Sequence, residues 1–148
     1  MSERSSGIIQ EAGANEPIVM RLRGEDSEGH LAVVEMSLTP NGHAPPLHVH
    51  PTHGEGFLVL AGELSLQLGD QVITGGPGTW AFAPRGVPHT LANLGDQEGR
   101  LLVVCTPAGF ERHWERIAAA AAGIEPPPWA LQPIPEITVL GPQIAEQT

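Results

Sequence analysis

Proline and glycine interrupt this chain so often that they constrain its fold more than any other feature. The 148 residues include fifteen prolines and eighteen glycines, which fall between short apolar runs. Short apolar runs separated by turn-forming residues are typical of all-β proteins. The length and the 41% apolar composition suffice for one globular domain with a single core. The sequence therefore predicts one all-β domain over residues 1–148.

Several of these runs alternate between apolar and polar residues, as half-buried strands do. Residues 18–23 read I-V-M-R-L-R, and residues 63–68 read E-L-S-L-Q-L with three leucines on one face. In the run T-W-A-F-A-P over residues 79–84, Trp80 and Phe82 share a face. Because tryptophan and phenylalanine bury large areas, we predict that these two rings lie in the core or form a pocket wall.

Residues 109–122 depart from this pattern and predict a helix. The segment carries strong helix formers and is followed by Gly123, which suits a C-terminal cap. Phe110, Trp114 and Ile117 share one helical face, so we expect the helix to pack on the outside of the β-domain or on a partner subunit.

The position of this helix divides the rest of the chain into a β-core before it and a tail after it. We predict a β-core over about residues 17–106 and an extended tail over residues 124–148. His113 lies off the apolar stripe of the helix and is predicted to be solvated. Near the N-terminus, residues 7–10 (G-I-I-Q) could form a short strand or pair with a neighbouring subunit.

A histidine-rich stretch over residues 42–62 concentrates the chemically active groups. It reads G-H-A-P-P-L-H-V-H-P-T-H-G-E-G-F-L-V-L-A-G. His48 and His50 are separated by one residue, so both rings point to the same side of an extended strand. Glu55 follows a four-residue turn, which directs its carboxylate back toward the two imidazoles. His53 lies in that turn, and we interpret it as a pocket-rim residue or a solvated turn residue.

A fourth candidate ligand is His89, which follows the rigid turn P-R-G-V-P. Three imidazole nitrogens and one carboxylate suit iron, manganese, nickel, cobalt or zinc, and they can leave positions open for water or substrate. We therefore predict one divalent transition metal ion per chain, whose identity the ligands do not decide.

The spacing of these residues resembles the two sequence motifs of the cupin superfamily. The first motif, G-x5-H-x-H-x4-E-x6-G, is met at Gly42, His48, His50, Glu55 and Gly62. The second motif, G-x5-P-x-G-x2-H-x3-N, is met at Gly78, Pro84, Gly86, His89 and Asn93. The resemblance implies a small single-domain cupin: a double-stranded β-helix, or jelly-roll barrel, with a short C-terminal helix. It also implies one metal held by His48, His50, Glu55 and His89.

Two residue types are absent from the chain and exclude several chemistries. The sequence contains no lysine and no tyrosine, so Schiff-base chemistry and tyrosine acid–base chemistry are excluded. This argues against similarity to the sugar epimerases, lyases and thiol dioxygenases among the cupins that depend on a tyrosine. The remaining acid–base candidates are Glu55, the histidines and metal-bound water. Cys105 lies in an apolar run and is predicted to be a buried, inert thiol.

The phrases around both motifs resemble small bacterial cupins of the quercetin dioxygenase type. That resemblance implies a metal-dependent dioxygenase acting on a small apolar or aromatic molecule, with Glu55 as both ligand and proton acceptor. Only Arg21, Arg23 and Arg100 could offer a cation to a charged substrate, which also favours an uncharged one. The alternatives are a metal-dependent isomerase or cyclase, and a non-catalytic cupin that binds a small ligand.

Charge and hydropathy restrict the partners. The net charge is −10 and no basic cluster occurs, so nucleic acid and anionic membranes are poor partners. No apolar stretch is long enough to span a bilayer, and the N-terminus lacks the layout of a secretory signal. We expect a cytoplasmic homodimer.

Overall fold

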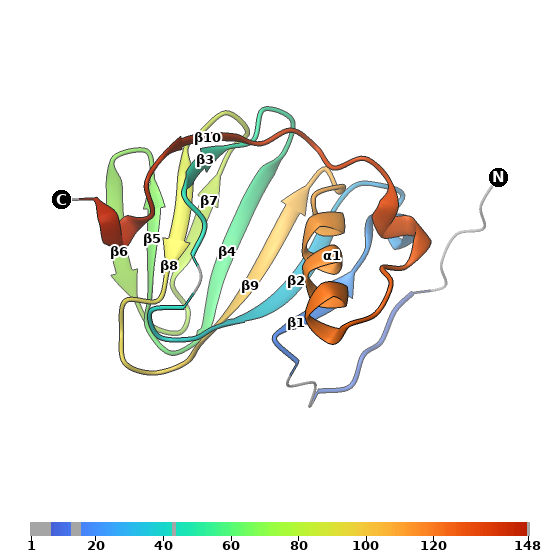
Figure 1. Cartoon of the computed structure of the whole chain (residues 1–148), viewed down its shortest axis with the longest axis horizontal. Helices are drawn as coiled ribbons and strands as arrows, with labels where there is room; N and C mark the ends of the chain where they lie inside the picture. The colour runs from blue at the N-terminus through green and yellow to red at the C-terminus, as the bar shows by residue number, and fades with distance from the viewer. Residues whose placement is uncertain (1–6, 13–15, 43, 148) are drawn as a thin grey trace.

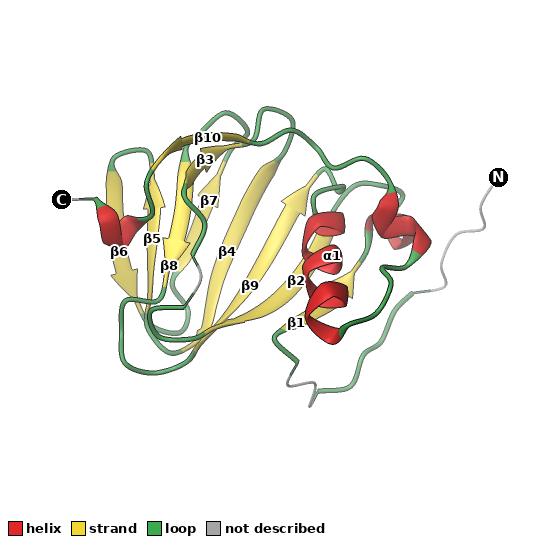
Figure 2. Cartoon of the chain, viewed as in Figure 1, coloured by secondary structure: helices red, strands yellow, loops and turns green. Residues whose placement is uncertain are grey.

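The computed structural model describes residues 7–12, 16–42 and 44–147. Over these residues the chain forms ten β-strands, one α-helix and three short 3-10 helices. The strands form two five-stranded antiparallel sheets that face each other, as Figure 2 shows. The predicted all-β jelly-roll fold with a short C-terminal helix is confirmed.

Strands that are distant in sequence are neighbours in both sheets, which is the signature of a jelly roll. The first sheet consists, in spatial order, of β1 (Ile18–Leu22), β2 (Ala32–Leu38), β9 (Gly99–Thr106), β4 (Gly54–Ala61) and β7 (Trp80–Ala83). The second consists of β10 (Thr138–Gly141), β3 (Leu47–Val49), β8 (His89–Ala92), β5 (Leu64–Leu68) and β6 (Gln71–Gly75). The chain therefore crosses from one sheet to the other several times before it completes the barrel.

Glycine is required where these crossings turn most sharply. Gly62, between β4 and β5, has a φ of 73°, which side chains resist. A Cβ atom at this position would also lie 2.6 Å from the backbone oxygen of Glu98. Gly86 adopts a φ of 83° in the turn that precedes β8. These two motif glycines thus fix the turn that follows β4 and the turn that precedes β8, and both strands contribute to the candidate site.

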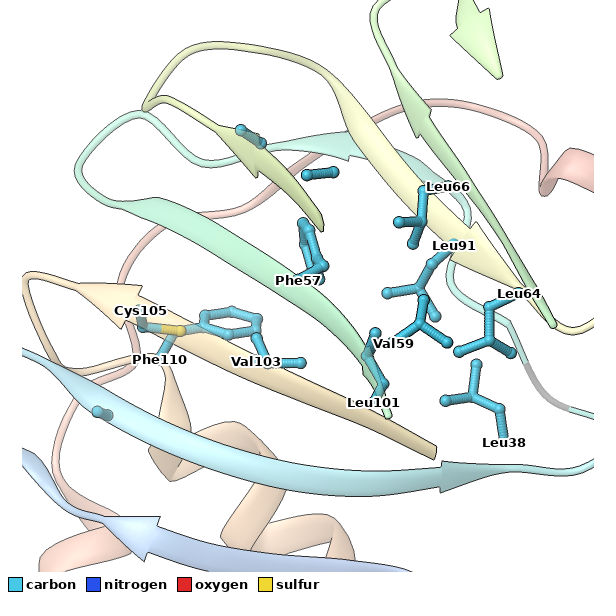
Figure 3. Packing of buried hydrophobic residues seen from close by; sticks show 13 residues of the cluster. Leu38, Phe57, Val59, Leu64, Leu66, Leu91, Leu101, Val103, Cys105 and Phe110 are labelled. Carbon is cyan, nitrogen blue, oxygen red and sulfur yellow. The ribbon is translucent and has the colours of Figure 1, made fainter. Parts of the chain in front are cut away.

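The hydrophobic core fills the space between the sheets (Figure 3). Strand β9 alternates buried and half-buried residues, so its inward side chains are fully covered. The buried side chains of the core include Phe57, Val59, Leu64, Leu66, Leu91, Leu101, Val103 and Cys105. Cys105 is buried as predicted, and burial raises the pKa of its thiol well above the ordinary value. A thiol in this state is inert at neutral pH.

Trp80 and Phe82 do not lie in the core, the first of the two environments predicted for them. On β7 the inward positions belong to Ala81 and Ala83, whereas Trp80 is 54% exposed and Phe82 is 43% exposed. Both rings line a hollow formed by β5, β6 and β7, apart from the histidine cluster. They also cover the neighbouring β4, where a Cβ atom on Gly56 would approach the Trp80 ring to 2.4 Å. The alternation was real, but it did not reveal which face pointed inward.

Helix α1 (Glu111–Ala122) packs against β1 and β2 at one end of the barrel (Figure 1). Gly123 ends it in the left-handed conformation, with a φ of 69°. At its start, the buried carboxylate of Glu111 accepts hydrogen bonds from the backbone N–H groups of Gly24 and Gly109. This ties the helix to η1 (Gly24–Asp26), the 3-10 turn between β1 and β2.

After α1 the chain returns across the domain. The proline-rich segment forms one 3-10 turn, η2 (Pro128–Leu131), against the helix. The tail then runs along the top of the view in Figure 1 and adds β10 beside β3, before the short η3 (Ile144–Glu146). Residues 7–10 form no strand within this chain. Among the described residues, no helix combines the length and apolarity that a membrane crossing requires.

Candidate metal centre

Both sheets contribute to one cluster of histidines and a carboxylate. His48 on β3 and His89 on β8 are directly opposite each other in the second sheet, so their side chains share a face. His50 follows two residues after His48 and returns to that face. Glu55 comes from β4 in the facing sheet. The structure therefore brings the four predicted side chains together, and all four are buried.

The distances within the cluster are short. The ring of His48 lies with its centroid 4.9 Å from that of His50 and 4.6 Å from that of His89. The candidate ligand atoms of these three histidines all lie within 4.8 Å of one another. Oε1 of Glu55 is 3.1 Å from Nε2 of His50, and Oε2 is 3.5 Å from Nε2 of His89.

Backbone carbonyl groups set the tautomer of all three histidines. Nδ1 lies 2.7 Å from the Pro46 oxygen in His48 and 3.0 Å from the Val87 oxygen in His89. In His50 the same atom lies 3.3 Å from the carbonyl oxygen of Glu136, a residue of the C-terminal tail. A carbonyl oxygen can only accept, so Nδ1 carries the hydrogen and Nε2 keeps a free lone pair. Metal-binding histidines are oriented by outer contacts of this kind.

The free lone pairs meet no donor in the protein. Nε2 of His50 and Nε2 of His89 are buried and have no hydrogen-bond partner among the described residues. Both atoms face the Glu55 carboxylate, which in its ionised form also only accepts hydrogen bonds. Buried acceptors that face one another are unfavourable unless a cation lies between them. The cluster therefore fits a divalent metal ion.

The electrostatics of the cluster keep His48 and Glu55 in the form that a metal requires. Burial lowers the pKa of His48 to about 4, so the ring is neutral at neutral pH. Burial raises the pKa of Glu55, but the imidazoles of His50, His53 and His89 outweigh it and hold that pKa well below the ordinary value. For His89, burial lowers the pKa and the adjacent Glu55 raises it, with a net increase. Glu55 is thus a carboxylate at neutral pH.

His53 departs from its predicted environment. The sequence suggested a pocket rim or a solvated turn, but the side chain is only 2% exposed. Its Nε2 lies 3.0 Å from Oε1 of Glu55, and its ring stacks on Phe110. The turn between β3 and β4 thus folds inward, and His53 packs against both His50 of the cluster and Phe110 at the start of α1. The sequence signal that could have placed His53 at the cluster is its position three residues after the H-x-H pair.

A cavity of about 290 Å³ opens beside the cluster and is lined by His48, Glu55 and His89. Its walls are mainly apolar and come from the barrel, from α1 and from the tail, which contributes Ile137. The predicted stripe of the helix faces this cavity, because Phe110, Trp114 and Ile117 all line it. His113 is exposed as predicted, yet it also lines the cavity. Periodicity predicted the helical face but could not predict what it covers.

Both the sequence and the structure of this chain are similar to those of known proteins. The family model described as "Cupin domain" matches residues 34–105. No curated protein matches the chain. Among solved structures, a protein from Thermus thermophilus is 30% identical, and the alignment covers 64% of this chain and 87% of that chain with a TM-score of 0.52.

Two further solved structures have named activities. A predicted oxalate decarboxylase from Thermotoga maritima is 24% identical, with 72% of this chain and 99% of that chain covered and a TM-score of 0.57. A sugar phosphate isomerase from a cupin superfamily, from Silicibacter pomeroyi, is 25% identical, with 61% of this chain and 59% of that chain covered and a TM-score of 0.52. What these two share with this chain is the fold.

Proposed function

The chain belongs to the cupin superfamily, and on that premise we propose that it is a metal-dependent enzyme acting on a small, uncharged organic molecule. The observation that carries this proposal is the apolar cavity that ends on a buried cluster of histidines and Glu55. His48, His50, Glu55 and His89 would hold one iron, manganese, nickel, cobalt or zinc ion. When bound, such an ion supplies Lewis acidity and a template for a coordinating oxygen.

The walls of the cavity favour a substrate without charge. Among the described residues that line it, none is an arginine, and the chain has no lysine. Arg21 and Arg100 instead bind Glu35, and Arg23 lies over the ring of Trp129. A phosphate or carboxylate that does not reach the metal would therefore be buried in this cavity without a cationic Arg or Lys side chain beside it, which is costly. This argues against a sugar phosphate, the substrate class named for one of the two similar structures.

Aromatic and aliphatic side chains would hold the substrate by burying its surface. Phe57, Phe110 and Trp114 offer rings to the cavity. Glu55 lines the same cavity as a carboxylate and would accept the proton of a phenolic or enolic hydroxyl group. The apolar walls would keep water away from that proton transfer.

The reaction that we propose is of the dioxygenase type, in which both atoms of O2 enter the organic product. It is supported by the donor set, by the apolar cavity and by the resemblance of the motif phrases to quercetin dioxygenase-like cupins. A location in the cytoplasm belongs to the same proposal.

Oxygen consumption tests this activity. Metal-loaded protein is mixed with a panel of flavonols and catechols, and O2 uptake is followed beside the metal-free protein and the Glu55→Gln variant. We expect uptake with at least one compound and none in the two controls. No uptake across the panel would contradict the dioxygenase assignment. Conversion without O2 would favour an isomerase or cyclase, and binding without conversion would favour a non-catalytic binding protein.

A further inference from the structure

His53 is a buried imidazole at the metal centre that is not among the four proposed ligands. Its ring contacts two others, with its centroid 4.2 Å from that of His50 and 5.3 Å from that of Phe110. The planes of His53 and Phe110 are inclined by only 27°, which is a stacked arrangement. Contact with these two rings and the hydrogen bond to Glu55 restrict rotation of the buried His53 ring, so its ring nitrogens have fixed directions.

The hydrogen on His53 lies on the opposite nitrogen from that of the three clustered histidines. Nε2 of His53 is 3.0 Å from Oε1 of Glu55, and an ionised carboxylate can only accept a hydrogen bond. Nε2 of His53 must therefore carry the hydrogen. Its Nδ1 is buried and has no hydrogen-bond partner among the described residues, whereas Nδ1 of His48, His50 and His89 donates to a carbonyl group. A nitrogen that donates in this way offers no lone pair to a metal.

His53 also approaches Glu55 from outside the cavity. Glu55, His48 and His89 line the cavity, whereas His53, like the proposed ligand His50, does not. The ligand atom of His53 groups with those of His50 and Glu55, and it is not part of the group formed by the three clustered histidines. The two oxygens of Glu55 differ in their neighbours: Oε1 accepts from His53 and also lies 3.1 Å from Nε2 of His50, whereas Oε2 lies 3.5 Å from Nε2 of His89.

We propose that His53 is a positioning residue, which donates a buried hydrogen bond to Oε1 of Glu55 and thereby fixes the orientation of the carboxylate at the metal. This inference rests on the proposed metal site. Hydrogen bonds to a ligating carboxylate fix its orientation, and losing such a partner typically weakens metal affinity by about 10–100-fold. Without His53, the Glu55 carboxylate could rotate about its terminal bond and would have no donor on Oε1.

Two substitutions of His53 distinguish a role as hydrogen-bond donor from a role as metal ligand. In His53→Gln, the side-chain amide can donate from nearly the same position as Nε2 but is a poor ligand for a transition metal. In His53→Leu, apolar bulk remains against Phe110 but the donor is lost. Affinity for Co(II) is measured by competition titration, and the visible absorption spectrum is recorded at saturation. The wild type and Glu55→Gln serve as references.

We expect His53→Leu to bind Co(II) about 10–100-fold more weakly than the wild type and His53→Gln to bind with nearly wild-type affinity. Both variants should give the wild-type spectrum at saturation because the ligand set is unchanged. Wild-type affinity in His53→Leu would overturn the proposal. Equal weakening in both variants, or an altered spectrum in His53→Gln, would also overturn it, because the imidazole itself would then be needed as a ligand.

A measurement without metal keeps the two proposals separate. Long-range ¹H–¹⁵N NMR of the metal-free protein reports which nitrogen of each histidine carries the hydrogen. We expect the hydrogen of His53 on Nε2, and a hydrogen on Nδ1 would overturn its role whatever the metal data show. A wild type that binds no Co(II) would instead contradict the metal site. Far-UV circular dichroism and thermal unfolding establish that each variant folds, and if His53→Leu does not, His53→Gln and the NMR result decide.

Discussion

Ion pairs between single residues on β2 and its two neighbouring strands stabilise one side of the barrel. Glu35 accepts hydrogen bonds from Arg21 and Arg100, at 3.0 Å and 2.8 Å. Burial raises the pKa of Glu35, but the hydrogen bonds from Arg100 and Arg21 outweigh it and lower that pKa below the ordinary value. Because the folded-state pKa is depressed, the ion pairs stabilise the protein above the ordinary carboxyl pKa of about 4.3. That stability is lost as the pH falls through the folded-state pKa of Glu35.

Glu35→Gln should therefore lower the free energy of unfolding at neutral pH and have a smaller effect in acid. Urea unfolding at a series of pH values, from neutral to below about pH 4, measures this difference. The control is Glu63→Gln, at a position outside the ion pairs found among the described residues. A difference between Glu35→Gln and wild type that does not shrink with acidification would contradict the role of the ion pairs.

Among the elements, strand β10 carries no proposed ligand, yet its loss should disturb the metal centre. Val139 pairs with His48 across β10 and β3, and three residues earlier the Glu136 carbonyl oxygen contacts Nδ1 of His50. The tail also supplies Ile137 to the cavity wall. The C-terminal segment thus orients one proposed ligand and closes part of the proposed substrate site.

Proline at Val139 tests this connection. The Val139 side chain is 62% exposed, so the main effect of Val139→Pro is on strand pairing, which proline disrupts. We expect metal affinity to fall by about 10–100-fold, as for loss of another outer contact of a ligand. Val139→Thr, which keeps the backbone N–H, should bind like wild type. Hydrogen exchange shows whether the tail has detached, and unchanged affinity with a detached tail would contradict the link.

The elements also show how far the sequence could predict the site. Alternation on an extended strand predicted that His48 and His50 share one face, and the second motif added His89 as a candidate ligand. That His89 lies directly opposite His48 comes from the structure alone. The same period of two could not tell inside from outside on β7, so Trp80 could not be kept out of the predicted core. The Glu136 carbonyl was beyond prediction, because every residue carries a carbonyl group and nothing local marks one that lies beside a histidine 86 positions away.

For the whole molecule, an exposed apolar side chain near the N-terminus is relevant to the proposed homodimer. The side chain of Ile9 is 98% exposed, and the segment around it forms no strand within the chain. The proposed homodimer would cover this segment by pairing it with a second copy. Light scattering coupled to size exclusion should give twice the chain mass of 15.6 kDa for the wild type. Ile9→Asp should give a single chain mass, and a monomeric wild type would contradict the dimer.

The fold as a whole serves to bring three histidines from one sheet and a carboxylate from the other to the end of an apolar cavity. Because His50 and His89 face Glu55 with free lone pairs, the central claim is that a divalent metal ion completes this cluster. Metal content by inductively coupled plasma mass spectrometry tests it most directly, on purified and on reconstituted protein. We expect one transition metal ion per chain in the wild type and none in Glu55→Gln or His89→Ala. A wild type without metal after reconstitution, or variants that keep it, would contradict the claim.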